Sequence, residues 1–533
     1  MGVSVAGEER VIGIDLGTTN SCVATVIDGT VHVVPDERGA RIQASMVAFL
    51  GDGSVVVGNE ARQEQIVDPT NTVYSAKRLI GRHFASKEVK TALQSFPYRI
   101  VKGKNNVPLV EIRNERYGLP EVSGMVLRRM KDIAERYVRG PVTKAVVTVP
   151  ANFNDTQRQM TKLAGTLAGL DVIRIINEPT AAALAYGYGR GMNARIAIYD
   201  FGGGTFDITL LEMRDNVFEV IATAGDTYLG GDDFDTRLAR YMMHAFKSQY
   251  GFSLEGDTIA VSRLKHVAEK VKCELSNNPR AVVNVAELAQ DNQGNLLDLR
   301  FQMSRDDFAE RHQDIVQRTF LVCDEALSLA GMKARDVDGV VLVGGTTRMP
   351  LVRQMVAEYF GRQPLTDINP EEVVAIGAAI QGAALEQDHF TTAGGTRRNT
   401  PLLLDVTPMS LGVQTVSGYY DVIIERNASI PCEVTRTFTT STDNQTSVRL
   451  QIFQGESKVA AENIKLGEIE LYGLRSGPRG QVELQVTFEI DTNGIVVVTA
   501  RDRETGIEQA TRIEVSAGYS PEEIAQMLER GVS

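Results

Sequence analysis

Two segments of the chain share one pattern, in which an apolar strand ends in an aspartate and continues into a turn of glycine and threonine. The two copies read IGIDLGTT (12–19) and AIYDFGGGT (197–205). Glycine lets the main chain approach a phosphate, successive N–H groups form an anion-binding nest, and a strand-end aspartate can hold a hydrated Mg²⁺. Because Asp15 and Asp200 lie 185 residues apart, the repeat predicts a duplicated domain whose halves face one nucleotide.

A third glycine turn follows the apolar strand at residues 341–343. It contains Gly344, Gly345 and Arg348, and it is placed to approach a nucleoside. The chain has no G-x-x-x-x-G-K-[ST] motif and no G-x-G-x-x-G after a strand in a dinucleotide-binding context. These absences exclude a P-loop protein and a Rossmann domain.

The elements that must position these turns change in character along the chain. Up to about residue 390, apolar strands alternate with helical stretches such as residues 155–168 and 180–188, which is typical of α/β layers. The expected strands there are residues 11–14, 145–149, 172–176, 195–199 and 340–343.

After about residue 407 the apolar residues alternate with period two, which predicts an all-β sandwich. The expected strands are residues 447–453, 481–490, 495–501 and 508–515. A capping box, Ser520-Pro521-Glu522-Glu523, then predicts the start of a helix.

The junction between the two parts combines a linker composition with an apolar segment. Residues 391–401 are rich in glycine, threonine and arginine, and Leu402, Leu403 and Leu404 follow directly. Two interpretations stay open for the leucines. They form the first strand of the β-domain, or they dock on a neighbouring domain in one state and release in another.

Composition narrows the class of protein. The 533 residues are 43% hydrophobic and 23% charged, as in an ordinary globular chain of several domains. The net charge of −12 gives no basic footprint for a nucleic acid, and no apolar run is long enough for a membrane span. The four cysteines lie far apart and residues 1–10 lack a signal-peptide core, so we expect a cytoplasmic protein without nucleic-acid or membrane partners.

Taken together, the motifs resemble the DnaK family of seventy-kilodalton heat-shock chaperones. The matching stretches, in family order, are IGIDLGTTNSCVA (12–24), AKRLIGR (76–82), AVVTVPANFNDTQRQ (145–159), RIINEPTAAALAYG (174–187), YDFGGGTFD (199–207), GDTYLGGDDFD (225–235), VLVGGTTRMP (341–350) and LLLDVTPMSLG (402–412). Asn20, after the double threonine, is similar to the bacterial or organellar branch of the family.

The resemblance implies a fold of several parts. An actin-like, ribonuclease H-like duplicated ATPase domain would occupy residues 11–390, after an N-terminal extension (1–10). An interdomain linker (391–406) would lead to a β-sandwich substrate-binding domain (407–519). Residues 520–533 would begin the helical lid, whose remainder is missing from the sequence.

The resemblance also implies which residues carry ATP hydrolysis. Asp15 and Asp200 would hold Mg²⁺ through water, Lys77 would reach the γ-phosphate, and the other members would organise water, metal and the γ-phosphoryl group. The implied catalytic set is Asp15, Lys77, Glu178, Asp200, Thr205 and Asp207. The implied phosphate cradle is Gly17, Thr18, Thr19, Asn20, Gly202, Gly203 and Gly204.

A nucleoside pocket is implied by a helix that carries Glu269, Lys272 and Ser276. Their spacing of i, i+3 and i+7 puts the three side chains on one helix face. The remaining implied members are Gly344, Gly345, Arg348 and Glu371.

In the β-domain, the resemblance implies an apolar cleft for extended peptides, whose main chain would supply sequence-tolerant hydrogen bonds. Its lining would be Val413, Val416, Tyr419, Phe438, Ser441, Val448 and Leu450. From the residues alone, sandwich core is the alternative for each apolar position. Val416 is shorter and Tyr419 is bulkier than the family usually has, so we expect a looser arch over the peptide.

Residues that would couple the domains are implied at Pro150, Arg158, Arg174, Leu402, Leu403, Leu404 and Asp405. Asn152 replaces a family aromatic residue beside this group. Pro401 stands where the family usually has valine, and its missing N–H should remove one possible hydrogen bond from a docked linker.

The implied function is that of an ATP-dependent chaperone that binds unfolded, extended hydrophobic polypeptides. Its cofactors would be ATP or ADP and Mg²⁺, with K⁺ as a further candidate. Its protein partners would be a J-domain co-chaperone, which would act near Arg174 and Asp405, and a nucleotide exchange factor. Two alternatives stay open: a peptide-binding adaptor or holdase with regulatory nucleotide binding, and an actin-like ATPase or kinase without client remodelling.

Overall fold

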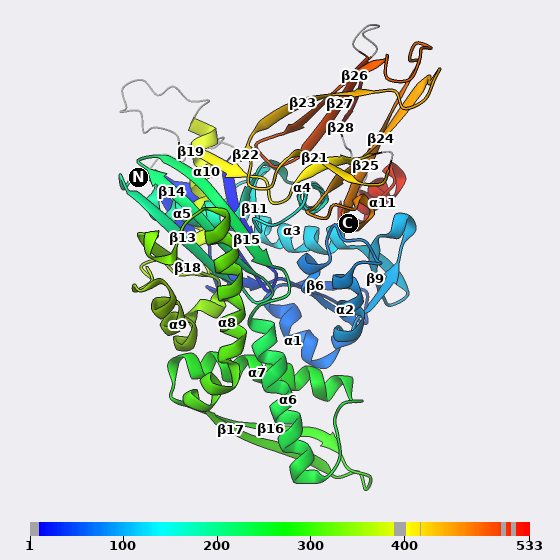
Figure 1. Cartoon of the computed structure of the whole chain (residues 1–533). Coiled ribbons are helices and arrows are strands. Elements are labelled where there is room, and N and C mark those ends of the chain that lie inside the picture. Colours follow the sequence, from blue (N-terminus) through cyan, green and yellow to red (C-terminus); the bar gives the residue numbers. More distant parts are fainter. Residues whose placement is uncertain (1–9, 388–400, 416, 503–507, 513–518, 533) are drawn as a thin grey trace.

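The computed structural model describes residues 10–387, 401–415, 417–502, 508–512 and 519–532. Figure 1 shows two α/β lobes side by side and a β-rich part above them. We call residues 10–187 lobe I, residues 193–387 lobe II, and residues 401–532 the β-domain. Among the described helices, none is long and apolar enough to cross a membrane.

One strand arrangement occurs twice, as the repeated sequence pattern predicts. In each lobe, a central strand pairs antiparallel with the next strand of a meander and parallel with a strand from later in the chain. Lobe I has the order β12-β11-β1-β2-β3, with β4 beside β2, and lobe II has the order β18-β13-β14-β15. The lobe I strands are β1 (Val11–Leu16), β2 (Asn20–Ile27), β3 (Thr30–Val33), β4 (Ile42–Ala44), β11 (Lys144–Val149) and β12 (Asp171–Asn177). The lobe II strands are β13 (Asn193–Phe201), β14 (Phe206–Arg214), β15 (Val217–Asp226) and β18 (Gly339–Val343).

The two sheets meet through a pair of helices, α5 (Glu178–Gly187) and α10 (Val373–Gln387). Close packing here requires glycine. A Cβ added to Gly377 of α10 would lie 1.7 Å from the carbonyl oxygen of Ala181, and one added to Gly13 of β1 would lie 2.1 Å from the Ala379 nitrogen. The strands that end in Asp15 and Asp200 are therefore held against one shared helix pair.

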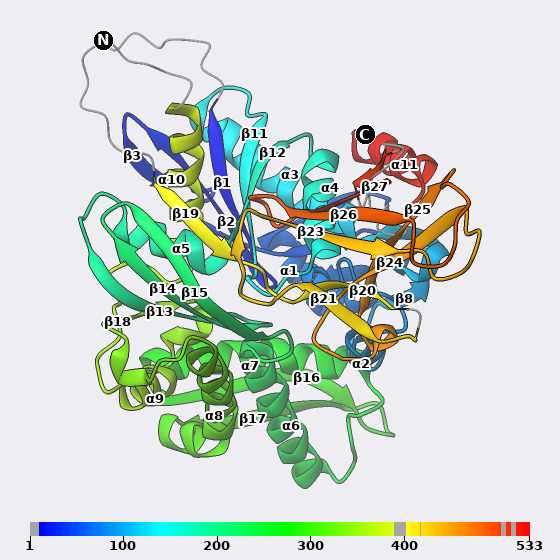
Figure 2. The same cartoon turned by 45° about the horizontal axis from the view of Figure 1, so that its top comes forward.

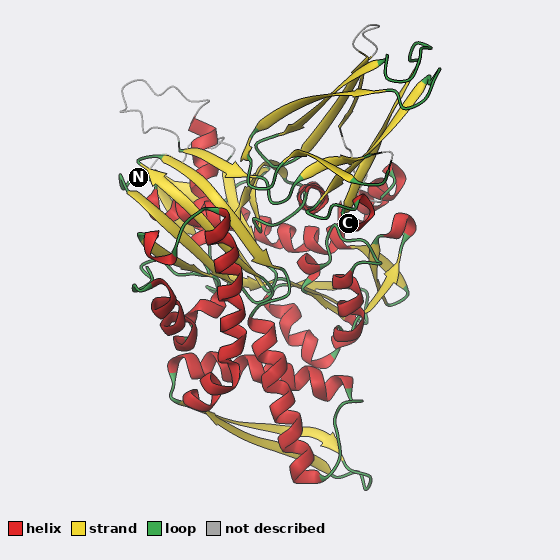
Figure 3. Cartoon of the chain, viewed as in Figure 1, coloured by secondary structure: helices red, strands yellow, loops and turns green. Residues whose placement is uncertain are grey.

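Helices and small sheets complete the lobes below and beside these sheets (Figure 3). Lobe I adds α1 (Asn59–Val67), α2 (Lys87–Ser95), α3 (Leu119–Val138) and α4 (Asp155–Leu167), with the short strands β5 (Met46–Phe49), β6 (Val55–Val57), β7 (Thr72–Tyr74), β8 (Arg99–Lys102), β9 (Pro108–Ile112) and β10 (Glu115–Gly118). Lobe II adds α6 (Gly231–Tyr250), α7 (Thr258–Asn277), α8 (Arg305–Leu329), α9 (Pro350–Phe360) and the hairpin β16 (Arg280–Gln290) and β17 (Leu296–Ser304).

The β-domain packs two four-stranded sheets around one apolar core, in agreement with the period-two pattern. One sheet is β21 (Tyr420–Ile424), β20 (Leu411–Gln414), β24 (Ser447–Gln454) and β25 (Ile464–Tyr472). The other is β23 (Cys432–Thr439), β26 (Glu483–Ile490), β27 (Val496–Asp502) and β28 (Glu508–Arg512). The expected strand 481–490 begins two residues later, and part of the expected strand 508–515 falls outside the described residues.

The leucine segment forms β19 (Leu402–Val406), and it joins the sheet of lobe II. Leu402 to Leu404 run parallel to residues 217–219 of β15, whereas Asp405 and Val406 pair with β22 (Ser429–Ile430) of the β-domain. Figure 2 shows β19 in yellow beside β15. The segment thus docks on lobe II and also pairs with the β-domain, whereas its release in another state stays a prediction. We call this arrangement docked below.

The expected effect of Pro401 on docking is wrong for this arrangement. The first docking hydrogen bond runs from the Leu402 N–H to the Asn216 oxygen at 2.9 Å. Pro401 therefore lies just before the ladder, where its missing N–H removes no bond.

The predicted helix after the capping box is α11 (Pro521–Val532). Its cap forms as expected, because Ser520 Oγ accepts from the Glu523 N–H and Glu523 Oε2 accepts from the Ser520 N–H. The helix packs on α3 and α4, and Tyr519 and Met527 are buried in the core of lobe I (Figure 2). The β-domain thus contacts both lobes.

Candidate active site

Four carboxylates and one lysine meet where β1 and β13 end. Asp15 and Asp200 line one cavity of about 80 Å³, together with Lys77 and Glu178. Asp207 lies directly opposite Asp200 in the β13–β14 register. The hairpin geometry of the repeat therefore brings together acidic side chains that are far apart in the sequence.

Lys77 is the cation at the centre of this cluster. Its ammonium lies 2.5 Å from Glu178 Oε1 and 2.5 Å from the Leu16 carbonyl oxygen, and the side chain is only 7% exposed. Thr148 Oγ1 also donates to Asp15 at 3.2 Å. The lysine thus ties the end of β1 to the start of α5 across the floor of the cavity.

The electrostatics of the cluster suit a further cation. Burial, with a contribution from Glu178, raises the pKa of Asp15 to about 7. Burial also raises the pKa values of Asp200 and Asp207 well above the usual range, against the opposing field of Lys77. A bound cation would favour the ionised carboxylates, and oxygen donors are the ligands that Mg²⁺ prefers.

The residues fit a hydrated Mg²⁺ better than a fully protein-bound ion. Asp207 Oδ1 is buried and has no hydrogen-bond partner, which leaves an acceptor for a metal-bound water. Within the described part of the chain, no three acidic, histidine or cysteine side chains converge closely enough to ligate one metal directly. The expected role of Asp15 and Asp200, which would hold Mg²⁺ through water, stays a prediction.

Residues of both glycine–threonine loops line the 80 Å³ cavity. Within the described residues, the N–H groups of Thr18, Thr19, Gly203 and Gly204 donate to no protein oxygen. Their carbonyls are held instead: Thr19 O accepts from the Ser45 N–H, and Gly203 O accepts from the Asp232 N–H. Fixed carbonyls with unused N–H groups form a nest for an anion such as a phosphate.

Glycine is required where the loops face each other. A Cβ added to Gly203 would lie 2.0 Å from Thr19 Oγ1 of the other lobe, and one added to Gly204 would lie 2.6 Å from Thr18 Cγ2. At Gly202, by contrast, an added Cβ would meet only ordinary contacts at 3.6 Å and beyond. No protein atom explains the glycine at 202, which is consistent with space reserved for a ligand.

The residues expected at a nucleoside are brought together only in part. Gly344, Gly345 and Glu371 line the 80 Å³ cavity, as do Asn20 and Thr205. Glu371 is 2.8 Å from Arg348, and Lys272 is engaged by Asp235 at 2.7 Å. Ser276 Oγ donates to the carbonyl of Lys272.

A larger cavity, of about 650 Å³, lies between the lobes and shares Thr18 and Thr19 with the smaller one. Sequence reasoning missed it, although Glu269 of the expected nucleoside helix lines it. Arg78 and Tyr228 also line it, and the ring of Tyr228 lies 5.0 Å below the Arg78 guanidinium. Arg78 lies in the quoted motif AKRLIGR and Tyr228 lies in the quoted motif GDTYLGGDDFD, so these two motifs could have indicated the cavity.

Of the residues expected to couple the domains, Leu402, Leu403 and Leu404 pair with lobe II, whereas Arg158, Arg174 and Asp405 lie where lobe I meets the β-domain. Arg158 donates to Asn177 Oδ1 at 2.7 Å within lobe I and to the Asn493 carbonyl of the β-domain at 3.3 Å. Asp405 of β19 accepts from Thr180 at 3.0 Å. Pro150 directly follows β11, and its carbonyl accepts from the Phe153 N–H.

Arg174 lies on β12 in the same region, where burial lowers its pKa against the fields of Asp491 and Asp405. Sequence reasoning assigned no role to Asp155, although it lies in the quoted motif AVVTVPANFNDTQRQ; its carboxylate accepts from the Val496 N–H of the β-domain at 2.9 Å. It also missed Arg426, which pairs with Glu325 of α8 at 2.8 Å.

The residues expected at a peptide cleft are divided between core and surface. Val413 is 1% exposed in the sandwich core, and Phe438, Val448 and Leu450 are half-buried around that core. Tyr419 is 63% exposed and Ser441 is exposed at a loop. Val416 lies outside the described residues. In the docked arrangement, Val413 therefore has no surface to offer a peptide.

Comparison with known families gives one match. A family model described as "Hsp70 protein" covers residues 11–532. Members of that family are ATPases that bind ATP or ADP with Mg²⁺ and act as chaperones. The match covers both lobes, the leucine segment and the β-domain, and we conclude that the chain belongs to the Hsp70 family.

Proposed function

We propose that the two lobes hydrolyse ATP and thereby control peptide binding by the β-domain. Family membership already assigns an ATP-dependent chaperone function in general terms. The finer proposal assigns residues 11–390 to an actin-like ATPase domain, 391–406 to the linker, 407–519 to a peptide-binding domain and 520–533 to a lid helix.

In this proposal, the unused amides of both loops bind the phosphates, and Lys77 with Glu178 orients the attacking water. Asp15 and Asp200 would hold Mg²⁺ through water, with Asp207 as acceptor for a further water, and the metal would supply charge neutralisation for the phosphates. Thr205 lies beside the same cavity to contact the γ-phosphoryl group. Positioning and charge stabilisation are most of what phosphoryl transfer requires of a protein.

The observation that carries the coupling proposal is the double pairing of β19. One short strand is hydrogen-bonded to the sheet of lobe II and to β22 of the β-domain. A change in the spacing of the lobes would therefore pull directly on a strand of the β-domain. Val413 and its neighbours would become accessible to an extended apolar peptide when the β-domain leaves the docked arrangement.

The proposed partners follow from the same contacts. Unfolded, extended hydrophobic polypeptides would bind the β-domain, a J-domain co-chaperone would act near Arg174 and Asp405, and an exchange factor would separate the lobes. The four cysteines are all free thiols, which suits the reducing cytoplasm that we propose as the compartment.

The proposal is tested by single-turnover ATP hydrolysis, with and without an unfolded hydrophobic peptide and a J-domain protein. We expect the peptide and the J-domain protein together to accelerate hydrolysis, and Asp405→Asn to remove that acceleration while basal hydrolysis persists. Unchanged hydrolysis in the presence of both would rule out the coupled machine. An ATPase without client remodelling would then describe the chain better.

A further inference from the structure

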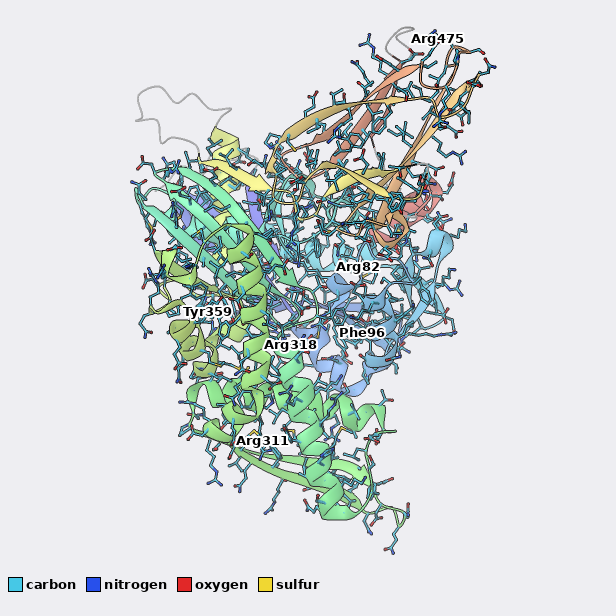
Figure 4. All side chains as sticks on the ribbon, viewed as in Figure 1. Arg82, Phe96, Arg311, Arg318, Tyr359 and Arg475 are labelled. Carbon is cyan, nitrogen blue, oxygen red and sulfur yellow. The ribbon has the colours of Figure 1, made fainter. Side chains whose placement is uncertain are left out.

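The 650 Å³ cavity between the lobes is built as a separate chamber outside the phosphate loops. Thr18 and Thr19 form its inner end, because they line both this cavity and the smaller one that contains Lys77 and Asp200. Lobe I supplies residues of α1, β7 and α2, and lobe II supplies residues of α6, α7 and α8. Figure 4 labels Phe96 of lobe I and Arg318 of lobe II, which both line it.

Contacts between the lobes bridge the cavity in two places. Along α1 and α7, Arg62 lies 3.6 Å from Glu269, and Ser262 Oγ donates to the Gln65 carbonyl at 3.5 Å. Near α2, the Tyr228 hydroxyl donates to the Glu88 carbonyl at 2.7 Å. A chamber bridged in this way can retain a small solute that an open cleft would lose.

Most charges that line the chamber already have partners. Asp232 is 3.2 Å from Arg78, and Asp235 is 2.7 Å from Lys272. Asp233 accepts from the Gly230 N–H, whereas Arg237 and Arg318 pair with Asp314 and Asp226 outside the chamber. Glu255 is an exposed carboxylate without an ion pair.

Among the cations that line the chamber, two have no hydrogen bond or ion pair within the described residues. They are Lys265 of α7 and Arg240 of α6. Lys265 is half-buried, and burial lowers its pKa, with Arg240 and Arg78 adding to that effect and Asp232 and Asp235 opposing it. His266, the neighbouring imidazole, also has its pKa lowered by burial and supplies no positive charge near neutral pH. Two cations that line one cavity and have no ion pair of their own among the described residues can both donate to an oxyanion.

Arg78 links this pair to the phosphate loops. Its guanidinium donates to the Gly204 carbonyl at 2.9 Å, next to the unused loop amides, and its Nε is buried without a partner. Arg78, Lys265 and Arg240 thus provide positive charge from the loop of lobe II out into the chamber. Acidic side chains also line the chamber, but Asp232 and Asp235 are each already paired with a cation.

We infer that Lys265 and Arg240 form a second oxyanion site, which holds the inorganic phosphate produced by ATP hydrolysis before it reaches solvent. This inference rests on the proposed ATPase function. Phosphate is the anion that hydrolysis delivers at the inner end of the chamber. ADP would still occupy the loops, and Glu269 is the one expected nucleoside residue that lines the chamber, so the chamber offers the phosphate a route past the bound nucleotide.

The site is tested first at equilibrium, by calorimetric titration of inorganic phosphate into the full chain saturated with ADP and Mg²⁺. We expect Lys265→Met and Arg240→Ala each to weaken phosphate binding about tenfold, as expected for the loss of one charge-assisted contact. Lys265→Met keeps the aliphatic stem and therefore the packing of α7. Lys270→Ala, an exposed lysine of the same helix, is the matched control and should bind phosphate as the unmodified chain does.

The kinetic test compares two signals in one turnover: acid-quenched hydrolysis and phosphate release reported by a fluorescent phosphate sensor. In the unmodified chain and in Lys270→Ala, release should lag behind hydrolysis, and excess unlabelled phosphate should shorten the time for which labelled product is retained. In Lys265→Met and Arg240→Ala, the lag should shrink at least threefold while hydrolysis stays unchanged.

Equal phosphate affinity in the variants, or an unchanged lag, would overturn the inference. A loss of hydrolysis itself in Lys265→Met would also overturn it, because the lysine would then act on the reaction and not on its product. If the unmodified chain hydrolyses no ATP, the proposed function fails, whereas the equilibrium titration still decides whether the second site exists.

Discussion

The phosphate cavity and the contact between lobe I and the β-domain both bury charged groups, but they treat them differently. Beside the cavity, Asp207 Oδ1 and the N–H groups of Thr18, Thr19, Gly203 and Gly204 have no hydrogen-bond partner among the described residues. At the domain contact, Asp155 and Arg158 are satisfied by groups of the β-domain. Buried polar groups without partners indicate a missing ligand, and those satisfied across a boundary indicate a partner that is already present. The phosphate cavity is thus arranged to bind a ligand, whereas the contact between lobe I and the β-domain is arranged to hold the docked state.

The largest effect should come from the cavity. Lys77→Ala removes the cation that contacts Glu178, and we expect hydrolysis to fall on the order of a hundredfold or more. The docked arrangement should persist, because no domain contact involves this lysine. Quenched-flow hydrolysis measures the first effect and fluorescence energy transfer between lobe II and the β-domain measures the second, with exposed Lys102→Ala as control.

The next largest effect should come from the domain contact. Arg158→Ala removes a buried guanidinium with acceptors on both sides of the boundary, and docking should weaken by about 1.5–3 kcal/mol. Arg158→Lys keeps the charge but loses the planar fork, so an intermediate effect is expected. The same energy-transfer assay measures docking. If the alanine variant docks normally, the buried contacts of Arg158 do not hold the β-domain on lobe I, and the contrast drawn between the two regions fails.

A pH dependence should separate the regions further. Burial raises the pKa of Asp155 to about 7 in the docked arrangement, from about 3.9 for an exposed aspartate. The docked state therefore binds more protons between these values, so docking should be strongest at low pH and weaken as pH rises towards 7. The charged groups that face this carboxylate are Arg158 and Asp491.

Asp155→Asn should remove most of this dependence, because asparagine does not titrate. The measurement is the docked fraction from pH 5.5 to 8.0 in both proteins. An identical slope in the variant would assign the titration to another group.

The smallest effect should come from the bridge across the larger cavity. Tyr228→Phe removes one neutral hydrogen bond to Glu88, worth about 0.5–1.5 kcal/mol. We expect ADP to dissociate about two- to tenfold faster, as measured with a fluorescent nucleotide. Tyr250→Phe, which also removes one hydrogen bond to a backbone carbonyl, is the control and should release ADP at the normal rate. A slower release in Tyr228→Phe would contradict the bridging role.

How far the sequence predicts the structure also differs between the regions. Asp15 and Asp200 stand at strand ends beside glycine turns, and buried carboxylates are rare enough that this pattern indicates a site. Val413 carries no such mark, because an apolar residue on a period-two strand is equally expected in a cleft and in a core. In the structure it belongs to the core.

The contacts across boundaries were the least predictable. Nothing in the local sequence relates Asp155 to Val496, or Tyr228 to Glu88, because these pairs depend on how the domains and lobes pack. The leucine segment illustrates the same limit: its pattern predicts a strand but not which sheet it joins, and the docked register begins one residue after Pro401.

The central claim is that nucleotide in the lobes controls the β-domain through β19. The most direct measurement is the dissociation rate of a fluorescent hydrophobic peptide after mixing with ATP or with ADP, in the unmodified chain and in Leu403→Asp. We predict that ATP, but not ADP, accelerates dissociation at least tenfold, and that Leu403→Asp abolishes the difference. Equal rates with both nucleotides in the unmodified chain, or a full ATP effect in the variant, would contradict the account.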